Sequence, residues 1–574
     1  MTNEIIANIL RNIGIYLEMK NISFKPRAYE KAAEFIESID VPLSEIYKRG
    51  GLRALIGLPA IGVSIAEHIE ELLKTGHLKY YEQLKNKTPV DLGELSSIEG
   101  LGPRSIKTLY KKLKIRNLKD LKKAAMAGKI RKLSGFGERS EENILKSVDF
   151  FEKSSDKFLL GFVMPEIREI ESRLNSLDGV KKAVIAGSVR RRKETVGDVD
   201  ILVVSDRPAA VMDYFVSMPE VGRIYAHGKT KSAVKFKNRM DADLRVVPLE
   251  SYGAALNYFT GSKNHNVKLR GTAIKKGYKL NEYGLFKGKR QIAGRTEEEL
   301  YKALGLEYIE PELREMTGEL EAAKAHKLPK LIDYGDLKGD LHTHSNWTDG
   351  VNSIEEMANA AIKAGLQYIA IMDHTKRLAM TNGLDEKRIQ KQWAEIDRIN
   401  LKLKTKNLKL KILKGTECDI LKDGSMDLPN SILAKCDIVG GSVHSLFNLS
   451  KKDQTERIKK AMSNPNVDII FHPTGRLLNK REAYDVDMEE IVRYAKKTGT
   501  ILEINSFPDR LDLNDENVKK CVEAGVKISI DSDGHSTEHF KYLEYGIAQA
   551  RRGWAERNDI INVWPMEKML KLLK

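Results

Sequence analysis

The sequence predicts a multidomain protein in which an all-α region, an α+β region and an α/β region follow one another. First, the chain has 574 residues, more than one hydrophobic core usually serves. Second, residues 1–150 show helical apolar spacing, whereas from about residue 151 β-rich runs lie between helical stretches. Third, after residue 337 short apolar strands alternate with helices, which favours a parallel α/β barrel or sheet.

Composition narrows the function classes. No segment offers the roughly 18 consecutive apolar residues of a membrane span, and Met1 to Glu4 are not a basic leader ahead of an apolar stretch. We therefore expect a cytoplasmic protein without a membrane partner. Cys418, Cys436 and Cys521 are odd in number and far apart, which excludes a disulfide framework and a thiolate zinc cluster.

The net charge of +16 and the pI near 9.3 favour a polyanionic partner, because neutralised phosphates release counterions. The same charge is also typical of a lysine-rich solvated surface. Charge alone therefore does not show whether the protein binds nucleic acid or has only a solvated basic surface.

Residues 1–88 are expected to form a small helical unit. Apolar side chains recur at helical spacing, as in Ile6, Ile9, Leu10 and Ile13, and Pro26, Pro42 and Pro59 interrupt the helices.

A glycine turn ahead of a helical stretch recurs three times in residues 55–150, at Leu58 to Gly62, Ile98 to Gly102 and Leu133 to Gly137. Unpaired N–H groups at such a turn can hold a phosphate oxygen. The turns resemble helix-hairpin-helix motifs, which grip the DNA backbone without recognising bases. The predicted DNA-binding glycines are Gly62, Gly100, Gly102, Gly135 and Gly137. The three turns need not all contact DNA.

Two pairs of aspartates are the first candidate for chemistry. Asp198 and Asp200 lie two apart on a predicted strand, so their carboxylates share a face, and Asp241 and Asp243 repeat this spacing. Three carboxylates brought together would suit two divalent ions, Mg²⁺ or Mn²⁺, for phosphoryl transfer.

A small turn precedes the first aspartate pair. Gly187 and Ser188 follow a predicted strand, Arg190, Arg191 and Arg192 come next, and Gly197 precedes Asp198. A turn with free N–H groups beside arginines is suited to a triphosphate. The glycine-serine turn, the arginines and the aspartate pair in this order indicate a nucleotide site far more specifically than any one of them does.

Residues 187–200 resemble the nucleotidyltransferase motif of X-family DNA polymerases, and the likeness spans roughly residues 1–318. It implies a palm over residues 151–250, a nucleotide-selecting thumb over 251–318, and Asp243 rather than Asp241 as the third catalytic aspartate, beside Arg245. It also implies nucleotide contacts for Gly187, Ser188, Arg191, Gly197, Tyr258, Phe259, Gly261, Asn266 and Arg270.

Two positions depart from that family. His68 stands where the eukaryotic repair enzyme has a Schiff-base lysine, and imidazole cannot replace the amine, so we expect no lyase activity unless Lys25, Lys31 or Lys74 substitutes. Lys263 stands where the family often has an acid near the base.

A series of histidines and acids runs through the C-terminal region, mostly at the ends of predicted strands, where α/β barrels place catalytic side chains. His342-x-His344 by itself favours a metal. The complete set is His342, His344, Asp349, His374, Glu417, His444, His472, Asp533 and His535.

This series resembles the PHP phosphoesterase domain, which implies three Zn²⁺ or Mn²⁺ ions. The implied ligands are His342, His344, Glu417 and Asp533 for the first, Glu417, His444 and His472 for the second, and Asp349, His374 and His535 for the third. Because no ligand is missing, we expect an active hydrolase of phosphate esters. Arg476 is a candidate phosphate contact.

The predicted organisation is a helical DNA-binding unit over 1–88, a second helix-hairpin-helix region over 89–150, palm, thumb, a linker over 319–337 and a PHP domain over 338–574. The predicted function is gap-filling DNA synthesis in repair, by a monomer that uses dNTPs and gapped or nicked duplex DNA. We expect the PHP domain to add 3′–5′ exonuclease activity, with 3′-phosphatase or abasic endonuclease activity as alternatives.

Three other functions stay open. The palm could belong to a template-independent nucleotidyltransferase. The chain could be an end-bridging DNA-binding protein with vestigial sites. The PHP domain could hydrolyse small phosphoesters unrelated to DNA.

Overall fold

The computed structural model describes residues 3–39, 41–96, 98, 101–154 and 157–573. Gly100 of the second predicted hairpin lies outside this range. Within it, no helix is both long and apolar enough to cross a membrane. The three cysteines are free thiols.

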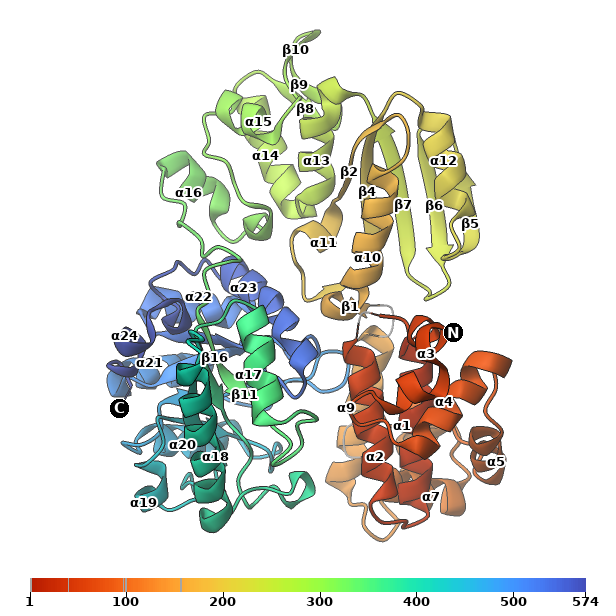
Figure 1. Ribbon diagram of the computed structural model, residues 1–574. Helices are drawn as coiled ribbons and strands as arrows, with labels where there is room; N and C mark the ends of the chain where they lie inside the picture. Colours follow the sequence, from red (N-terminus) through yellow and green to blue (C-terminus); the bar gives the residue numbers. More distant parts are fainter. Residues whose placement is uncertain (1–2, 40, 97, 99–100, 155–156, 574) are drawn as a thin grey trace.

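The N-terminal region is entirely helical, drawn red to orange in Figure 1. Its helices are α1 (Asn3–Met19), α2 (Lys25–Ser38), α3 (Leu43–Ile56), α4 (Val63–Thr75), α5 (Lys79–Lys87), α6 (Leu92–Leu95), α7 (Pro103–Leu113), α8 (Leu118–Met126) and α9 (Glu138–Ser154). One hydrophobic cluster runs from Ile6 to Val148. The two helical units predicted from the sequence therefore share a core.

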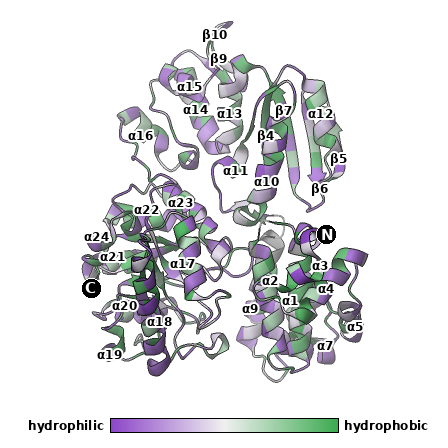
Figure 2. Ribbon diagram, in the orientation of Figure 1, coloured by the Kyte–Doolittle hydropathy of each residue, from purple (hydrophilic) through white to green (hydrophobic). Residues whose placement is uncertain are grey.

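The palm is a five-stranded mixed sheet in the order β2-β4-β7-β6-β5. Its strands are β2 (Val180–Ile185), β4 (Asp198–Ser205), β5 (Val221–His227), β6 (Lys231–Phe236) and β7 (Asp241–Val247). The helices around it are α10 (Leu160–Asn175), α11 (Gly187–Arg190) and α12 (Pro208–Ser217), and β1 (Phe158–Leu159) pairs with β3 (Thr195–Val196). Figure 2 shows mainly hydrophobic residues on β4 and β7, whose inner positions are buried.

The thumb packs helices against a three-stranded antiparallel sheet in the order β10-β9-β8. Its elements are α13 (Tyr252–Thr260), α14 (Lys263–Lys275), β8 (Lys279–Asn281), β9 (Gly284–Lys287), β10 (Arg290–Ala293), α15 (Glu297–Ala303) and α16 (Glu319–Ala325).

Helix α16 lies within the stretch that the sequence analysis assigns to the linker. Leu320 and Ala323 are buried in the thumb core, and Glu319 accepts a hydrogen bond from His265 at 2.6 Å. The linker therefore begins after α16. The sequence does not indicate this helix, because the segment is charged. Its buried acid, Glu319, pairs with His265, which is far away in the sequence.

The C-terminal region is a seven-stranded parallel sheet in the order β11-β12-β13-β14-β15-β16-β17. The strands are β11 (Gly339–Thr343), β12 (Tyr368–Ile371), β13 (Lys411–Asp419), β14 (Ile438–Ser442), β15 (Ile469–Ile470), β16 (Ile501–Asn505) and β17 (Ile528–Asp531). Thr343 bridges Gly534 in parallel, so the ends of β11 and β17 meet and the sheet is nearly a closed barrel. This confirms the predicted parallel α/β fold.

Helices surround this barrel. They are α17 (Ile354–Lys363), α18 (Glu386–Thr405), α19 (Asn430–Leu433), α20 (Lys451–Met462), α21 (Met488–Thr498), α22 (Asp515–Ala524), α23 (Leu543–Arg552) and α24 (Met566–Leu570). Capping residues determine where several of these helices begin. Ser353 and Glu356 form a capping box on α17, and Asp385 caps α18. In Figure 1 the barrel region lies below the palm and beside the N-terminal helices.

Candidate metal centres and nucleic-acid interface

The palm sheet brings the predicted catalytic aspartates together. Strands β4 and β7 pair in parallel, with Asp200 opposite Asp243 and Asp198 opposite Asp241. Side chains two apart on a strand share a face, so Asp198, Asp200 and Asp243 project to the same side of the sheet. The shared face that the spacing of the aspartates predicts is therefore present in the fold.

The charges of these carboxylates repel one another. Burial and the neighbouring charges of Asp198 and Asp243 raise the pKa of Asp200 to about 6. Burial and the charges of Asp243 and Asp241 also raise the pKa of Asp198. The ammonium of Lys231 lies 3.1 Å from Asp243. A site with this excess of negative charge suits divalent cations.

Gly187 allows the turn to approach the aspartates. Its φ is 62°, and a Cβ at this position would lie 2.4 Å from Oδ2 of Asp200. Any side chain would therefore clash with Asp200, which explains why glycine stands at this position. Gly197, directly before Asp198, has open space around it.

The arginines after this turn are held by acids of the thumb. Arg190 donates to both carboxylate oxygens of Glu297, at 3.0 and 2.7 Å. Arg191 donates to Glu315 at 2.7 Å and to the carbonyl of Thr260 at 2.7 Å. The nucleotide role of Arg191 stays a prediction.

Internal hydrogen bonds hold the segment that is predicted to select the nucleotide. Asn266 donates to the carbonyls of Tyr258, at 2.7 Å, and Gly261, at 2.9 Å. Phe259 stands edge-on to Tyr258 and lies under the guanidinium of Arg245, 4.8 Å from its ring centroid. Arg245 and Phe259 line a small hollow with Asp200 and Asp243. The structure thus places this segment beside the aspartates.

The hairpin glycines lie at helix starts on the surface. Gly62 precedes α4, Gly102 precedes α7 and Gly137 precedes α9. All three are exposed, have negative φ and leave open space where a Cβ would stand. Neither packing nor backbone strain requires glycine there, which fits close approach of an external backbone such as that of DNA. Gly135 is also exposed, with a φ of 87°.

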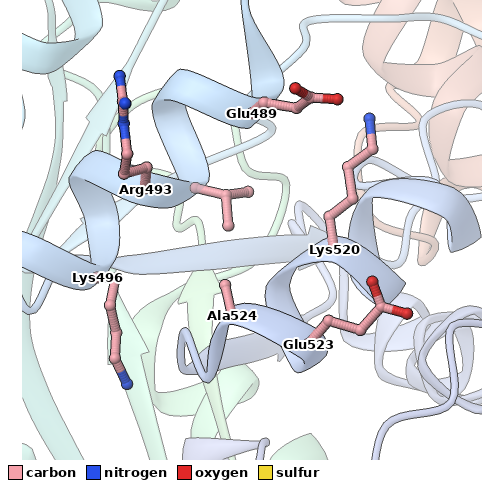
Figure 3. Close-up of a pocket in the computed structure, with 7 residues that line it drawn as sticks. Glu489, Arg493, Lys496, Lys520, Glu523 and Ala524 are labelled. Atoms are coloured by element: carbon pink, nitrogen blue, oxygen red, sulfur yellow. The ribbon is translucent and has the colours of Figure 1, made fainter.

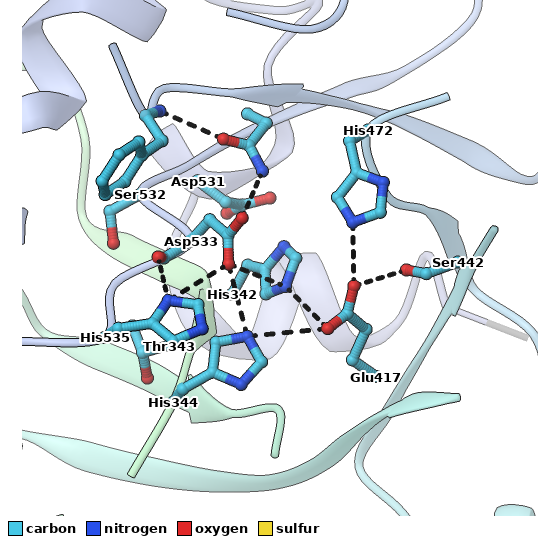
Figure 4. Close-up of polar contacts among 12 residues, drawn as sticks. His342, Thr343, His344, Glu417, Ser442, His472, Asp531, Ser532, Asp533 and His535 are labelled. Atoms are coloured by element: carbon cyan, nitrogen blue, oxygen red, sulfur yellow. Dashed lines mark hydrogen bonds and ion pairs between the residues drawn. The ribbon is translucent and has the colours of Figure 1, made fainter. Parts of the chain in front are cut away.

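The barrel collects all the predicted C-terminal ligands into one largely buried cluster. Three groups have ligand atoms within 4.8 Å of one another: His342, His344 and Asp533; His374, Glu417 and His444; and His344, Asp349, His374 and His535. His472 Nε2 lies 2.9 Å from Glu417. Figure 4 shows Asp533 facing His342 and His344, and Glu417 facing His472. Parallel strands place these side chains together because their carboxyl ends share one edge.

The cluster fits divalent ions. Buried nitrogens of His342, His344, His374 and His472 and an oxygen of Asp349 have no hydrogen-bond partner within the described chain. Such atoms are costly to bury unless a ligand satisfies them. Imidazole and carboxylate together suit zinc or manganese better than magnesium.

Several partners behind the ligands could not be anticipated from motifs. Nδ1 of His342 lies 2.6 Å from Glu503, and Nδ1 of His444 lies 2.7 Å from Asp419. Ser442 donates to Glu417 at 2.6 Å, and Nε of Arg510 lies 3.4 Å from Asp533. Contacts of this kind fix the orientation of metal ligands. Asp419 and Ser442 are the last residues of their strands, but Glu503 lies within β16 and Arg510 lies in the loop after it, so no common sequence signal marks them.

The structure gives partners to two further side chains that the sequence analysis names. Arg476, a candidate phosphate contact, instead forms a two-pronged ion pair with Glu194 of the palm, at 3.1 and 2.7 Å. His68 stacks between the rings of Tyr29 and Tyr80 and lies 3.0 Å from the hydroxyl of Tyr29. An aromatic stack explains the imidazole at this position.

A groove between α21 and α22 shares no residue with the cluster. Figure 3 shows its charged rim, to which Glu489, Arg493 and Lys520 belong. Charges of both signs alternate there, so the groove offers no site for one kind of ion.

Four family models match the chain: a helix-hairpin-helix domain at residues 1–78, a SAM-like helix-hairpin-helix tandem at 92–148, a DNA polymerase beta thumb at 255–315 and a PHP domain at 340–507. They follow the order predicted from the sequence.

Relatives of known name cover the chain in whole or in part. It is 37% identical to a DNA polymerase/3′-5′ exonuclease PolX of Bacillus subtilis over 582 aligned residues, 100% of both chains. It is 35% identical over 208 residues to a probable phosphatase of Thermoanaerobacter, covering 34% of this chain and 78% of that one. It is 27% identical over 321 residues to rat DNA polymerase lambda, covering 50% of this chain and 52% of that one. The chain belongs to the X family of DNA polymerases that carry a C-terminal PHP domain.

Proposed function

We propose that this protein fills short gaps in duplex DNA during repair and removes nucleotides from 3′ ends with its PHP domain. The single observation that carries the proposal is the presence in one chain of two intact sites, the aspartate face of the palm and the buried ligand cluster of the barrel. Full-length identity to a polymerase that is also a 3′-5′ exonuclease supports it.

Asp198, Asp200 and Asp243 would hold Mg²⁺ or Mn²⁺, which lower the pKa of the primer hydroxyl and stabilise charge on the phosphorus. Gly187 and Ser188 would bind the triphosphate of the incoming dNTP through their backbone, with Arg191 and Gly197 beside them. Tyr258, Phe259 and Gly261 would contact its sugar, and Asn266 and Arg270 the base pair. Gly62, Gly102, Gly135 and Gly137 would hold the backbone of the gapped or nicked duplex.

The PHP cluster would hold three Zn²⁺ or Mn²⁺ ions, which activate water and neutralise the phosphate ester. His342, His344, Glu417 and Asp533 would ligate the first ion, and Glu417, His444 and His472 the second. Asp349, His374 and His535 would ligate the third. Arg510, beside Asp533, would orient the phosphate.

A second candidate for the PHP domain is removal of a terminal 3′ phosphate. The likeness of 34% of the chain to a probable phosphatase favours it. Comparing matched primers with a 3′ hydroxyl and a 3′ phosphate separates the two activities.

The test uses primer extension and degradation on a duplex with a one-nucleotide gap, with Mg²⁺ and Mn²⁺ supplied separately. We expect Asp198→Ala to lose only synthesis and His344→Ala to lose only 3′ degradation. Synthesis that continues without a complementary template would favour a template-independent transferase. If both variants keep the activities assigned to their sites, the proposal fails and an end-binding role replaces it.

A further inference from the structure

Helix α2 of the N-terminal region contacts the loop that carries Asp349 in the PHP domain. Arg27 Nη2 donates to the carbonyl of Thr348 at 3.4 Å, and Lys31 Nζ donates to the carbonyl of Gly350 at 3.2 Å. These two carbonyls flank Asp349 on either side. Arg27 and Lys31 are four residues apart, so they project from one face of α2.

The loop over residues 345–351, here the Asp349 loop, is tightly folded. A Cβ at Gly350 would lie 2.7 Å from the backbone of Ser345, so the two ends of the loop touch. From the barrel side, Asp373 accepts from the N–H of Ser345 at 2.8 Å and from the hydroxyl of Thr348 at 2.5 Å. The barrel thus holds the loop as far as Thr348, and α2 contacts the carbonyls on both sides of Asp349.

Val351 links this loop to a second ligand. Its side chain packs against the hydrophobic core of the N-terminal helices, and its N–H donates to the carbonyl of His535 at 2.9 Å. Asp349 itself lies 3.3 Å from His374 and 3.7 Å from His535. The helical region therefore touches the backbone that positions both Asp349 and His535.

Asp349 needs this support more than the other acids of the cluster. Its side chain is 21% exposed, compared with 1% for Glu417 and 9% for Asp533. Glu417 lies within β13 and Asp533 lies two residues after β17, whereas Asp349 lies six residues after β11. A ligand on a loop reaches its geometry only when the loop is fixed from outside.

We propose that Arg27 and Lys31 are positioning residues of the phosphoesterase site, through which the N-terminal helical region completes the binding site of the ion held by Asp349, His374 and His535. This inference rests on the proposed function of the PHP domain. The other two ions depend on ligands that the barrel supports by itself.

The chain offers a matched control. Arg139 of α9 donates to the carbonyl of Asn448 at 2.6 Å, which is also a contact between the helical region and the barrel domain. Asn448 lies outside the ligand set. Removing this contact weakens the same interface without touching the Asp349 loop.

The test compares the full-length parent, Arg27→Ala/Lys31→Ala, Arg27→Lys/Lys31→Arg and Arg139→Ala. Each protein is loaded with Mn²⁺ and desalted, and the ions per chain are counted by plasma mass spectrometry. Hydrolysis of bis(p-nitrophenyl) phosphate is then followed against Mn²⁺ concentration, because this small diester does not depend on DNA binding. Thermal unfolding checks that each variant is folded, and the single variants Arg27→Gln and Lys31→Gln serve if the double alanine variant is not.

We expect the double alanine variant to retain about one ion fewer than the parent and to need roughly tenfold more Mn²⁺ for half-maximal hydrolysis. The double conservative variant should recover most of both properties, and Arg139→Ala should match the parent. Unchanged ion content and unchanged Mn²⁺ dependence in the alanine or glutamine variants overturn the inference alone. A parent that retains no ions and does not hydrolyse the diester overturns the proposed function and the inference with it.

Discussion

The palm and thumb neutralise their buried charges with protein groups, whereas the barrel keeps buried charges for which the chain supplies no full set of partners. Arg314 is fully buried and pairs with Glu297, which also binds Arg190. In the barrel, Glu417 and Asp533 are surrounded by histidines, several of which have a buried nitrogen without a hydrogen-bond partner among the described residues. In the first arrangement each charge has an opposite charge within the chain, although one nitrogen of Arg314 lacks a hydrogen-bond partner among the described residues. The second arrangement suits cations as additional partners.

The two candidate sites differ in the same way. The palm aspartates lie on one face of a sheet, and Mg²⁺ bound by a few carboxylates usually takes its remaining ligands from substrate phosphates and water. The barrel brings nine candidate ligands together from its strands and loops. We infer that the palm acquires its ions with the nucleotide, whereas the barrel retains its ions between reactions.

The largest expected effect comes from removing one acid in each site. Glu417→Gln should lower 3′ degradation by at least about 10³-fold, because metal ions supply several kcal/mol to such a reaction, and the desalted protein should lose ions. Asp200→Asn should lower synthesis by a similar factor and leave the ion content of the desalted protein unchanged. Gel-based assays and metal analysis measure both. Loss of retained ions in Asp200→Asn would contradict the difference between the sites.

Breaking the buried ion pair of the thumb should lower the free energy of unfolding without reducing metal binding. Glu297→Gln leaves Arg314 without its charge partner, so we expect the free energy of unfolding at pH 7 to fall by about 3 kcal/mol. Urea unfolding measures this, with Glu298→Gln, an exposed neighbour on α15, as the control. Equal effects of the two substitutions would contradict the prediction.

The same pair predicts a pH dependence. Burial favours the neutral acid, but Arg314 and Arg190 outweigh it and lower the pKa of Glu297 from 4.5 to about 2. Because the folded-state pKa is depressed, the stabilisation is fully present above about pH 4.5 and is lost as the pH falls toward about 2. The difference between parent and Glu297→Gln should shrink over that window.

A smaller effect is expected from a residue behind the metal ligands. Glu503→Gln keeps the size of the side chain but removes the charge that orients His342, and partners of this kind are typically worth 10–100-fold in metal affinity. Competition with a chelator measures the affinity. Glu489→Gln, on the groove between α21 and α22 (Figure 3), is the control and should have no effect. Unaltered affinity in Glu503→Gln would show that the barrel does not depend on this contact.

The smallest effect concerns the contact between palm and barrel. A double-mutant cycle on Arg476→Ala and Glu194→Ala should give a coupling energy of about 1 kcal/mol, because the pair is two-pronged and only partly exposed. Thermal unfolding of the four proteins provides it. Lys480→Ala breaks an exposed pair within the barrel domain and serves as the comparison. A coupling energy of zero would mean that the palm region and the barrel region unfold independently of this contact.

The sequence by itself determined the local parts of both sites. Alternation along a strand places Asp198 and Asp200 on one face, and the order of histidines at strand ends predicts their meeting at one edge of a parallel barrel. Glycine turns before helix starts are also local, and the helices follow them as expected. These features depend on periods of a few residues, which a sequence displays directly.

Only the tertiary structure decided which distant groups support these sites. Glu503 behind His342, Glu194 opposite Arg476, and α16 inside the thumb follow no local pattern. The contact of α2 with the Asp349 loop joins residues more than 300 apart in the chain. Such contacts depend on how whole domains pack, and a charged residue that pairs across an interface has the same local sequence as one that faces water.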